Sequence, residues 1–185
     1  MEPRLGPSSH VILGILAGAG PQTPYRMQQI VGRTVGFYWP FPHAQLYKET
    51  GRLAALGMVS ETAEPAGRRR KLYSITEQGR AALQVWLAAP TREPAQFRDL
   101  GLLKLAFASV ASPMARQLLR EDQLAAHTGR LRTYQGYAAI PMDRYLRATL
   151  ELGLRYEAAA VDFWRSIAEE DLGAEPAGST AVPTE

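Results

Sequence analysis

The sequence predicts a mainly α-helical protein in two parts, and three observations support this prediction. Apolar residues recur at helical spacing through most of the 185 residues. Two short runs with strand character, residues 58–62 and 71–76, flank a turn-forming stretch. Residues 90–97 contain two prolines and are typical of a linker. We therefore expect a first domain over residues 1–89, a helical domain over residues 98–172 and a disordered tail over residues 173–185.

The composition narrows the class of protein. Hydrophobic residues make up 46% of the chain and charged residues 21%, which favours a globular core over disorder or a fibrous repeat. The absence of cysteine excludes a disulfide framework, a thiolate zinc site and a cysteine nucleophile, and it agrees with a cytoplasmic location. No stretch approaches the roughly 18 to 20 apolar residues that span a bilayer. The apolar run 11–19 resembles a signal peptide, but Glu2 offsets Arg4, so a positively charged leader is missing and we interpret the run as a buried helix.

Local signals predict the first two helices. Ser8 and Ser9 are expected to cap the first helix, which ends in the glycine- and proline-containing stretch 18–21. Thr23 precedes Pro24, which pairs an N-cap oxygen with the one helical position where a missing N–H costs nothing. The second helix is therefore expected to begin there.

A loop, a third helix and a hairpin follow. The aromatic segment 37–42 is expected to form a packed loop, because the residue before a proline avoids the helical conformation. A third helix is predicted over residues 43–56, with Gly57 as its stop, and a fourth begins after the second strand. Aromatic side chains that we interpret as core or dimer packing, in preference to a ligand cage, are Phe37, Trp39, Phe41 and Trp86.

Beyond the linker almost every residue is predicted to be helical. Helices are expected over residues 97–110, from Ser112 to about residue 139, and from residues 141–143 to about residue 172. Helices of roughly thirty residues span about 45 Å and would leave apolar flanks uncovered without a partner chain. We therefore expect a homodimer that forms through the C-terminal helices. The acidic side chains expected to be solvated on the last helix are Asp143, Glu151 and Glu157.

The sign of the net charge changes at the boundary between the two predicted domains. The formal net charge is +3, but ten basic and five acidic residues up to Ala89 give +5, and eleven basic and thirteen acidic residues after it give −2. Only three of the 21 basic residues are lysine. Arginine suits phosphate and base-edge recognition, although an arginine-rich chain can equally reflect a GC-rich genome. The asymmetry indicates different partners for the two halves.

Three helices followed by a basic hairpin are the pattern of a winged helix-turn-helix domain, in which the third helix enters the DNA major groove. Segments that cover nearly all of residues 8–88 carry a closer likeness: Ile12-Leu13-Gly14-Ile15-Leu16, Tyr25-Arg26-Met27, Trp39-Pro40, Gln45-Leu46-Tyr47, Arg52-Leu53, Leu56-Gly57-Met58-Val59 and residues 71–80. On these motifs the sequence resembles the PadR-like transcriptional regulators. Phe97-Arg98-Asp99 and residues 102–105 resemble the entry to the C-terminal dimerisation domain of the longer PadR subfamily.

Three residues depart from the family pattern. Pro24 replaces a usual glycine, Thr50 stands where leucine is usual, and Gly51 follows it inside the recognition helix. A glycine there costs about 1 kcal/mol relative to alanine.

The resemblance implies a dimeric, ligand-responsive repressor that binds a pseudo-palindromic operator in double-stranded DNA. It also implies an aromatic or hydrophobic effector, whose site no residue identifies, and no cofactor. Two alternatives stay open: an activator with the same fold, and a winged module that binds a protein in place of DNA. An enzyme is not indicated, because the three histidines show no metal-site spacing with carboxylates and no serine lies in a nucleophile elbow.

The candidate DNA-binding residues are Tyr25, Arg26, His43, Gln45, Tyr47, Lys48, Arg52, Arg68, Arg69, Arg70 and Lys71. The two tyrosines are either core residues or amphipathic side chains that offer a hydroxyl to a phosphate. His43, Gln45 and Lys48 lie on the early turns of the third helix, where glutamine can pair with adenine and lysine can reach guanine. Residues 68–71 are either a phosphate-binding run or a solvated flank of the hairpin.

Overall fold

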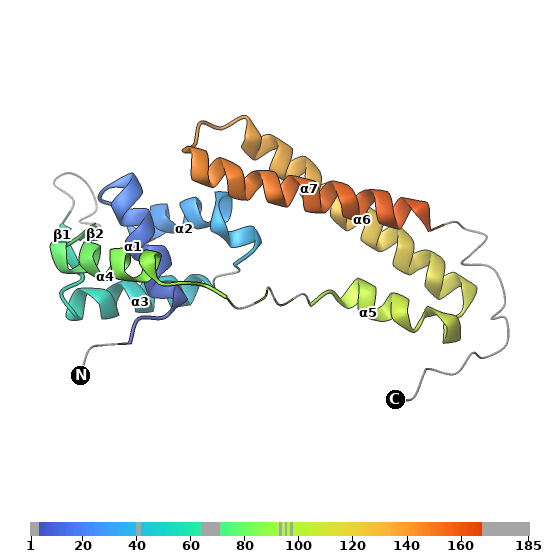
Figure 1. The fold of residues 1–185 in the computed structure, drawn as a ribbon, viewed down its shortest axis with the longest axis horizontal. Coiled ribbons are helices and arrows are strands. Elements are labelled where there is room, and N and C mark those ends of the chain that lie inside the picture. Colours follow the sequence, from blue (N-terminus) through green and yellow to red (C-terminus); the bar gives the residue numbers. More distant parts are fainter. Residues whose placement is uncertain are drawn as a thin grey trace. The chain divides into compact units, whose positions relative to one another are not determined.

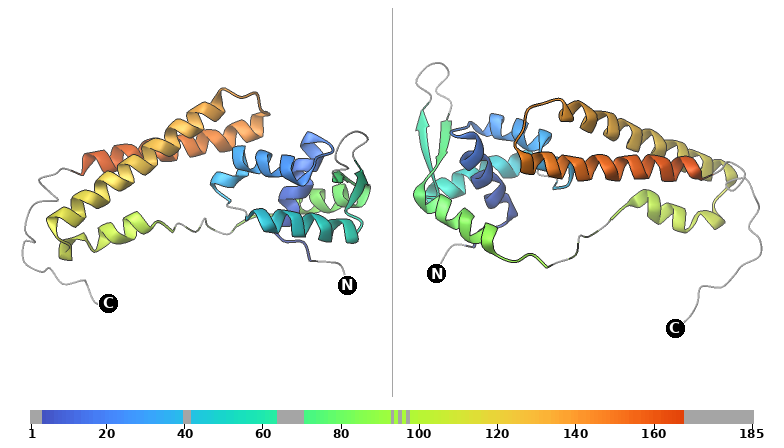
Figure 2. Two further views of the ribbon diagram at one scale, coloured as in Figure 1. Left: turned by 180° about the vertical axis from the view of Figure 1, so that it is seen from behind. Right: turned by 45° about the horizontal axis from the view of Figure 1, so that its top comes forward.

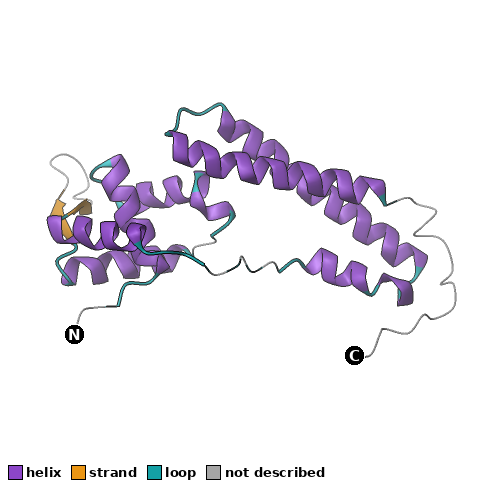
Figure 3. Cartoon of the chain, viewed as in Figure 1, coloured by secondary structure: helices purple, strands orange, loops and turns teal. Residues whose placement is uncertain are grey.

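The computed structural model describes residues 4–39, 42–63, 71–92, 94, 96 and 98–167. The chain divides into two compact units, Met1–Glu93 and Pro94–Glu185. Their boundary falls within the predicted linker, residues 90–97, while the predicted tail, residues 173–185, lies outside the described residues. Within the described residues the strands belong to the first unit and the second unit is helical (Figure 3).

The first unit has the predicted order of three helices, a hairpin and a fourth helix (Figure 1). Its elements are α1 (Pro7–Ala19), α2 (Pro24–Arg33), the 3-10 turn η1 (Val35–Phe37), α3 (His43–Ala55), β1 (Val59–Ala63), β2 (Lys71–Ile75) and α4 (Glu77–Ala88). The predicted mainly α-helical, winged fold is confirmed.

Caps set most of the helix starts. The Thr23 hydroxyl accepts a hydrogen bond from the Arg26 amide at 3.3 Å, which confirms the predicted cap of α2. The start of α1 differs from the prediction, because Pro7 takes the first helical position and Gly6 becomes the N-cap. Ser9 therefore lies inside the first turn, where its hydroxyl accepts from the Gly6 amide and donates to Glu49.

The core of the first unit lies around α1 and draws on every neighbouring element. Its fully or nearly buried side chains are Ile12, Leu13, Leu16, Met27, Val31, Leu46, Leu53, Met58, Val59, Tyr73 and Leu83. This cluster fixes α2 and α3 relative to each other, as a helix-turn-helix requires.

The two strands form an antiparallel hairpin (Figure 2). Its register places Glu61 opposite Tyr73 and Ala63 opposite Lys71. Gln22 extends it: its amide donates to the Tyr73 carbonyl at 3.0 Å, and the Tyr73 amide donates back to the Gln22 carbonyl at 2.9 Å. The residue before the α2 cap is thereby joined to the base of the wing.

For two aromatic side chains predicted as core or dimer packing, the structure excludes the core of the first unit. Trp39 and Trp86 are each 48% exposed, and the Trp86 ring stacks on His10 at 4.4 Å between centroids. The segment predicted as a loop from residue 37 is helical as far as Phe37, in η1. The Phe37 side chain and Phe41 lie outside the described residues.

The second unit is formed by α5 (Leu100–Ala106), η2 (Ala108–Val110), α6 (Pro113–Ala138) and α7 (Arg144–Ser166), where α6 and α7 pack side by side (Figures 1 and 2). Asp99, Ser112 and Asp143 cap these helices. The predicted helix 97–110 is interrupted at Phe107, where α5 ends and a 3-10 turn follows. None of the described helices is long and apolar enough to cross a membrane.

Glu157 corrects a further prediction. It was expected to be solvated, but it is only 4% exposed, between α6 and α7. Its carboxylate lies 2.6 Å from Nδ1 of His127 and accepts from Nε of Arg130 at 2.9 Å. Both partners come from α6, 30 and 27 residues away in the sequence, so the α7 pattern could not reveal them. Asp143 and Glu151 are exposed, as predicted.

Candidate nucleic-acid interface

An open groove of about 580 Å³ lies in the first unit where α2 begins, beside α3 and β2. Its lining residues are Thr23, Pro24, Tyr25, Tyr47, Lys71 and Tyr73. Three of the predicted site residues, Tyr25, Tyr47 and Lys71, are thus brought together from three separate elements.

The lining offers hydrogen-bond donors to an anion. Tyr25 is 56% exposed and Tyr47 51%, which excludes the core interpretation for both rings. The groove borders the amino end of α2, where amide groups without helical partners and the helix dipole favour negative charge. Tyrosine hydroxyls, a lysine and a helix start are the groups that proteins use to hold DNA phosphates. This chemistry suits one backbone phosphate.

Glu61 contacts two lining residues of the groove, Lys71 and Tyr73. Its carboxylate lies 2.9 Å from Nζ of Lys71 and accepts from the Tyr73 hydroxyl at 2.9 Å. The hydrogen bonds from Lys71 and Tyr73 lower the pKa of Glu61, and burial together with Glu61 raises the pKa of Tyr73 to about 12. Because the ion pair is exposed and screened by solvent, an arriving phosphate can compete for Lys71.

The predicted site residues of α3 lie on different faces of the helix. Leu46, Thr50 and Leu53 point into the core, and the Thr50 hydroxyl donates to the Leu46 carbonyl at 2.8 Å. The buried Thr50 is therefore satisfied within its own helix. Tyr47 and Lys48 are exposed and available to a partner.

Gln45 and Arg52 lie on the face of α3 that meets α1. The Gln45 amide nitrogen donates to the Ser8 hydroxyl at 2.6 Å. The Arg52 guanidinium donates to Glu49 at 2.7 and 2.9 Å and to the Ser9 hydroxyl at 3.1 Å. These contacts hold α3 against α1, a role that sequence spacing did not suggest.

The other predicted residues lie apart from the groove. Arg26 borders a separate depression on α2 together with Gln29 and Arg33. The side chain of His43 and the residues Arg68, Arg69 and Arg70 lie outside what the structure describes.

Sequence reasoning missed Thr23, Pro24 and Tyr73 as lining residues. The strand alternation could have found Tyr73, because residues two apart on a strand share a face and Lys71 was already a candidate. The position of Thr23 follows from its role as the cap that precedes Tyr25.

Comparison with known proteins shows which regulators this chain is similar to. Residues 12–85 match the model of the transcriptional regulator PadR-like family, and residues 97–170 match the model described as virulence activator alpha C-term. The negative transcriptional regulator PadR of Bacillus subtilis (strain 168) is 28% identical over 129 residues, which cover 69% of this chain and 70% of that protein. The first unit thus carries a PadR-like transcriptional regulator domain, and the chain is similar to a PadR regulator over more than two thirds of its length.

Solved structures of related regulators are similar to this chain over most of its length. Bacillus subtilis PadR in complex with operator DNA has a TM-score of 0.77 at 25% identity, covering 89% of this chain and 98% of that one. The same regulator in complex with p-coumaric acid has a TM-score of 0.71 at 25% identity, over 92% and 99%. The Vibrio cholerae virulence activator AphA has a TM-score of 0.63 at 26% identity, over 91% and 96%. This PadR-like chain therefore shares the winged fold and the C-terminal helices of DNA-binding regulators.

Proposed function

We propose that this PadR-like regulator is a homodimeric, ligand-responsive repressor in the bacterial cytoplasm that binds a pseudo-palindromic operator. The groove that joins Tyr25, Tyr47 and Lys71 carries the proposal, because it combines a helix start, two exposed phenols and a lysine beside α3. In this proposal the groove holds a backbone phosphate while Tyr47 and Lys48 face the DNA. The structure of Bacillus subtilis PadR in complex with operator DNA supports operator DNA as the partner.

The exposed apolar surface of the second unit supports dimerisation. Large apolar side chains on α5, η2 and the start of α6 are more than half exposed: Leu100, Leu103, Phe107, Val110, Met114 and Leu118. Exposed apolar surface of this extent usually marks a protein interface. A second copy would cover it and place two recognition helices about 34 to 36 Å apart, one DNA turn.

An activator is the second candidate. Its support is AphA, a virulence activator by name, and the match of residues 97–170 to a virulence activator domain. A ligand response is supported by the PadR structure with p-coumaric acid. Footprinting on the DNA that flanks the gene, followed by a reporter assay on that promoter, distinguishes repression from activation.

The phosphate role of the groove is tested by Tyr47→Phe. Loss of one hydrogen bond to a charged group should weaken operator binding about tenfold. Fluorescence anisotropy with the footprinted duplex measures the dissociation constant. Tyr145→Phe is the matched control, since Tyr145 is 68% exposed in the second unit and should leave affinity unchanged. If Tyr47→Phe and the unaltered protein bind the operator with equal affinity, the Tyr47 hydroxyl does not contact the DNA.

A further inference from the structure

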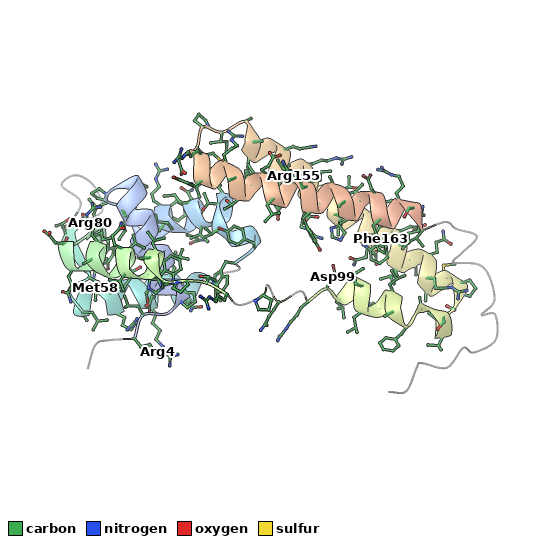
Figure 4. All side chains as sticks on the ribbon, viewed as in Figure 1. Arg4, Met58, Arg80, Asp99, Arg155 and Phe163 are labelled. Atoms are coloured by element: carbon green, nitrogen blue, oxygen red, sulfur yellow. The ribbon has the colours of Figure 1, made fainter. Side chains whose placement is uncertain are left out.

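The second unit contains a small pocket of about 250 Å³ between the start of α5 and the α6–α7 pair. Figure 4 labels two of its residues, Asp99 at the α5 cap and Phe163 on α7. The lining residues are Asp99, Leu102, His127, Tyr156, Ala159, Ala160, Phe163 and Trp164. Pockets for drug-sized ligands measure roughly 300–1,000 Å³, so this one suits a smaller molecule.

Aromatic rings from α7 form much of the lining. Tyr156, Ala159 or Ala160, and Phe163 recur at helical spacing and share one face of α7. The two alanines leave space between the rings. Phe163 packs edge-to-face on Trp164 at 5.4 Å between centroids. Tyr156 is 40% exposed and Phe163 43%, so a molecule in solution can reach the rings.

The two carboxylates near this pocket, Glu157 and Asp99, differ in whether a cation pairs with them. Glu157 does not line the pocket, and its carboxylate is already paired with His127 and Arg130. Asp99 accepts a hydrogen bond from the Leu102 amide at 3.0 Å, but among the described residues no cation forms an ion pair with it. Arg98 borders the neighbouring depression with Leu100 and Leu103 and does not line this pocket.

Asp99 and Glu157 also act on the phenol of Tyr156. Burial raises its pKa, and the negative charges of Asp99 and Glu157 raise it further, while Arg130 partly offsets them. The pocket therefore has a negative electrostatic environment next to aromatic rings. An aromatic carboxylate would meet the Asp99 carboxylate, whereas a cation would be attracted by both features.

We propose that this pocket binds a small organic ammonium cation, with its alkylated nitrogen against the rings of Tyr156 and Phe163 and its charge balanced by Asp99. Aromatic faces attract cations through their quadrupole, and rings combined with a carboxylate discriminate strongly against neutral molecules of the same shape. Binding of the cation does not depend on the proposed function. Only a role of this cation as an effector rests on the proposed function.

Calorimetric titration of the full-length protein with choline and with its neutral isostere, 3,3-dimethylbutan-1-ol, tests the site. Choline should bind about tenfold more tightly or better, and p-coumarate should not compete with it. Equal affinities for choline and the isostere, or displacement of choline by p-coumarate, would overturn the proposal.

Asp99→Asn isolates the charge. Asparagine caps helices as well as aspartate does, so α5 should keep its start. This variant should lose the choline preference, while Asp162→Asn, which removes an exposed carboxylate elsewhere on α7, should keep it. An unchanged choline preference in Asp99→Asn would overturn the assignment. Operator binding is measured separately without choline, so failure of the DNA-binding proposal is distinguishable from failure of the cation site.

Discussion

At the scale of single residues, two helical glycines show how surroundings decide the effect of a side chain. A Cβ on Gly51 would meet nothing within 4 Å, on the exposed side of α3. A Cβ on Gly79 would lie 2.1 Å from the Met58 carbonyl oxygen, at the point where α4 crosses the first residues after α3. Glycine therefore lowers the stability of α3 at Gly51, whereas α4 requires glycine at Gly79 because a larger side chain would overlap the backbone.

Gly51→Ala is predicted to raise the free energy of unfolding by about 1 kcal/mol, because alanine restricts the unfolded chain and fits the helix. Gly79→Ala is predicted to lower it by about 1–3 kcal/mol, because the new methyl group overlaps backbone. Urea denaturation of both variants measures these changes. Destabilisation by Gly51→Ala would mean that this face of α3 is not open.

At the scale of elements, the joint between α1 and α3 is polar as well as apolar. Glu49 is held by Ser9 of α1 and by Arg52 of its own helix, and its side chain is 15% exposed. The Arg52 hydrogen bonds lower the pKa of Glu49, burial opposes them, and the Ser9 hydrogen bond adds to the lowering. The ionised form of Glu49 therefore stabilises the orientation of the recognition helix.

Glu49→Gln is predicted to remove a pH-dependent part of the stability. Because the pKa of Glu49 is lowered in the folded protein, its contribution is present above the ordinary value of 4.5 and is lost as the pH falls through the lowered value. The stability difference between the unaltered protein and Glu49→Gln should thus shrink below about pH 4.5. Denaturation at pH 7 and at pH 3.5 measures it; a constant difference would contradict the prediction.

At the scale of the whole molecule, the small net charge of +3 conceals a basic first part and an acidic second part. This division agrees with DNA recognition by the first unit and self-association through the second. The exposed apolar side chains on α5 and the start of α6 are the surface that we expect a second copy to cover.

Light scattering at micromolar concentration is predicted to give twice the chain mass of 20.4 kDa. Leu103→Glu, which places a charge on the 57% exposed Leu103, should weaken the dimer and therefore operator binding. Val85→Glu is the control, because Val85 is 73% exposed in the first unit. A persistent monomer of the unaltered protein would refute the dimeric architecture.

Local chemistry alone was enough to predict most element starts. Thr23 before Pro24, Ser112 before Pro113, and Asp143 all act within three residues of themselves, so the amino-acid order determines them. The winged order of elements and the PadR-like family followed from the same local patterns.

Which side chains from distant parts of the sequence contact each other could be seen only in the folded protein. It joined Tyr25, Tyr47 and Lys71 in one groove, used Gln45 and Arg52 between α3 and α1, and buried Glu157 against His127 and Arg130. These partners lie between about 22 and 46 residues apart in the sequence, where spacing along a single helix carries no information. The pattern of a single helix predicts that a charged residue is exposed to solvent. Its actual burial depends on the element that packs against it, which the pattern of that helix does not include.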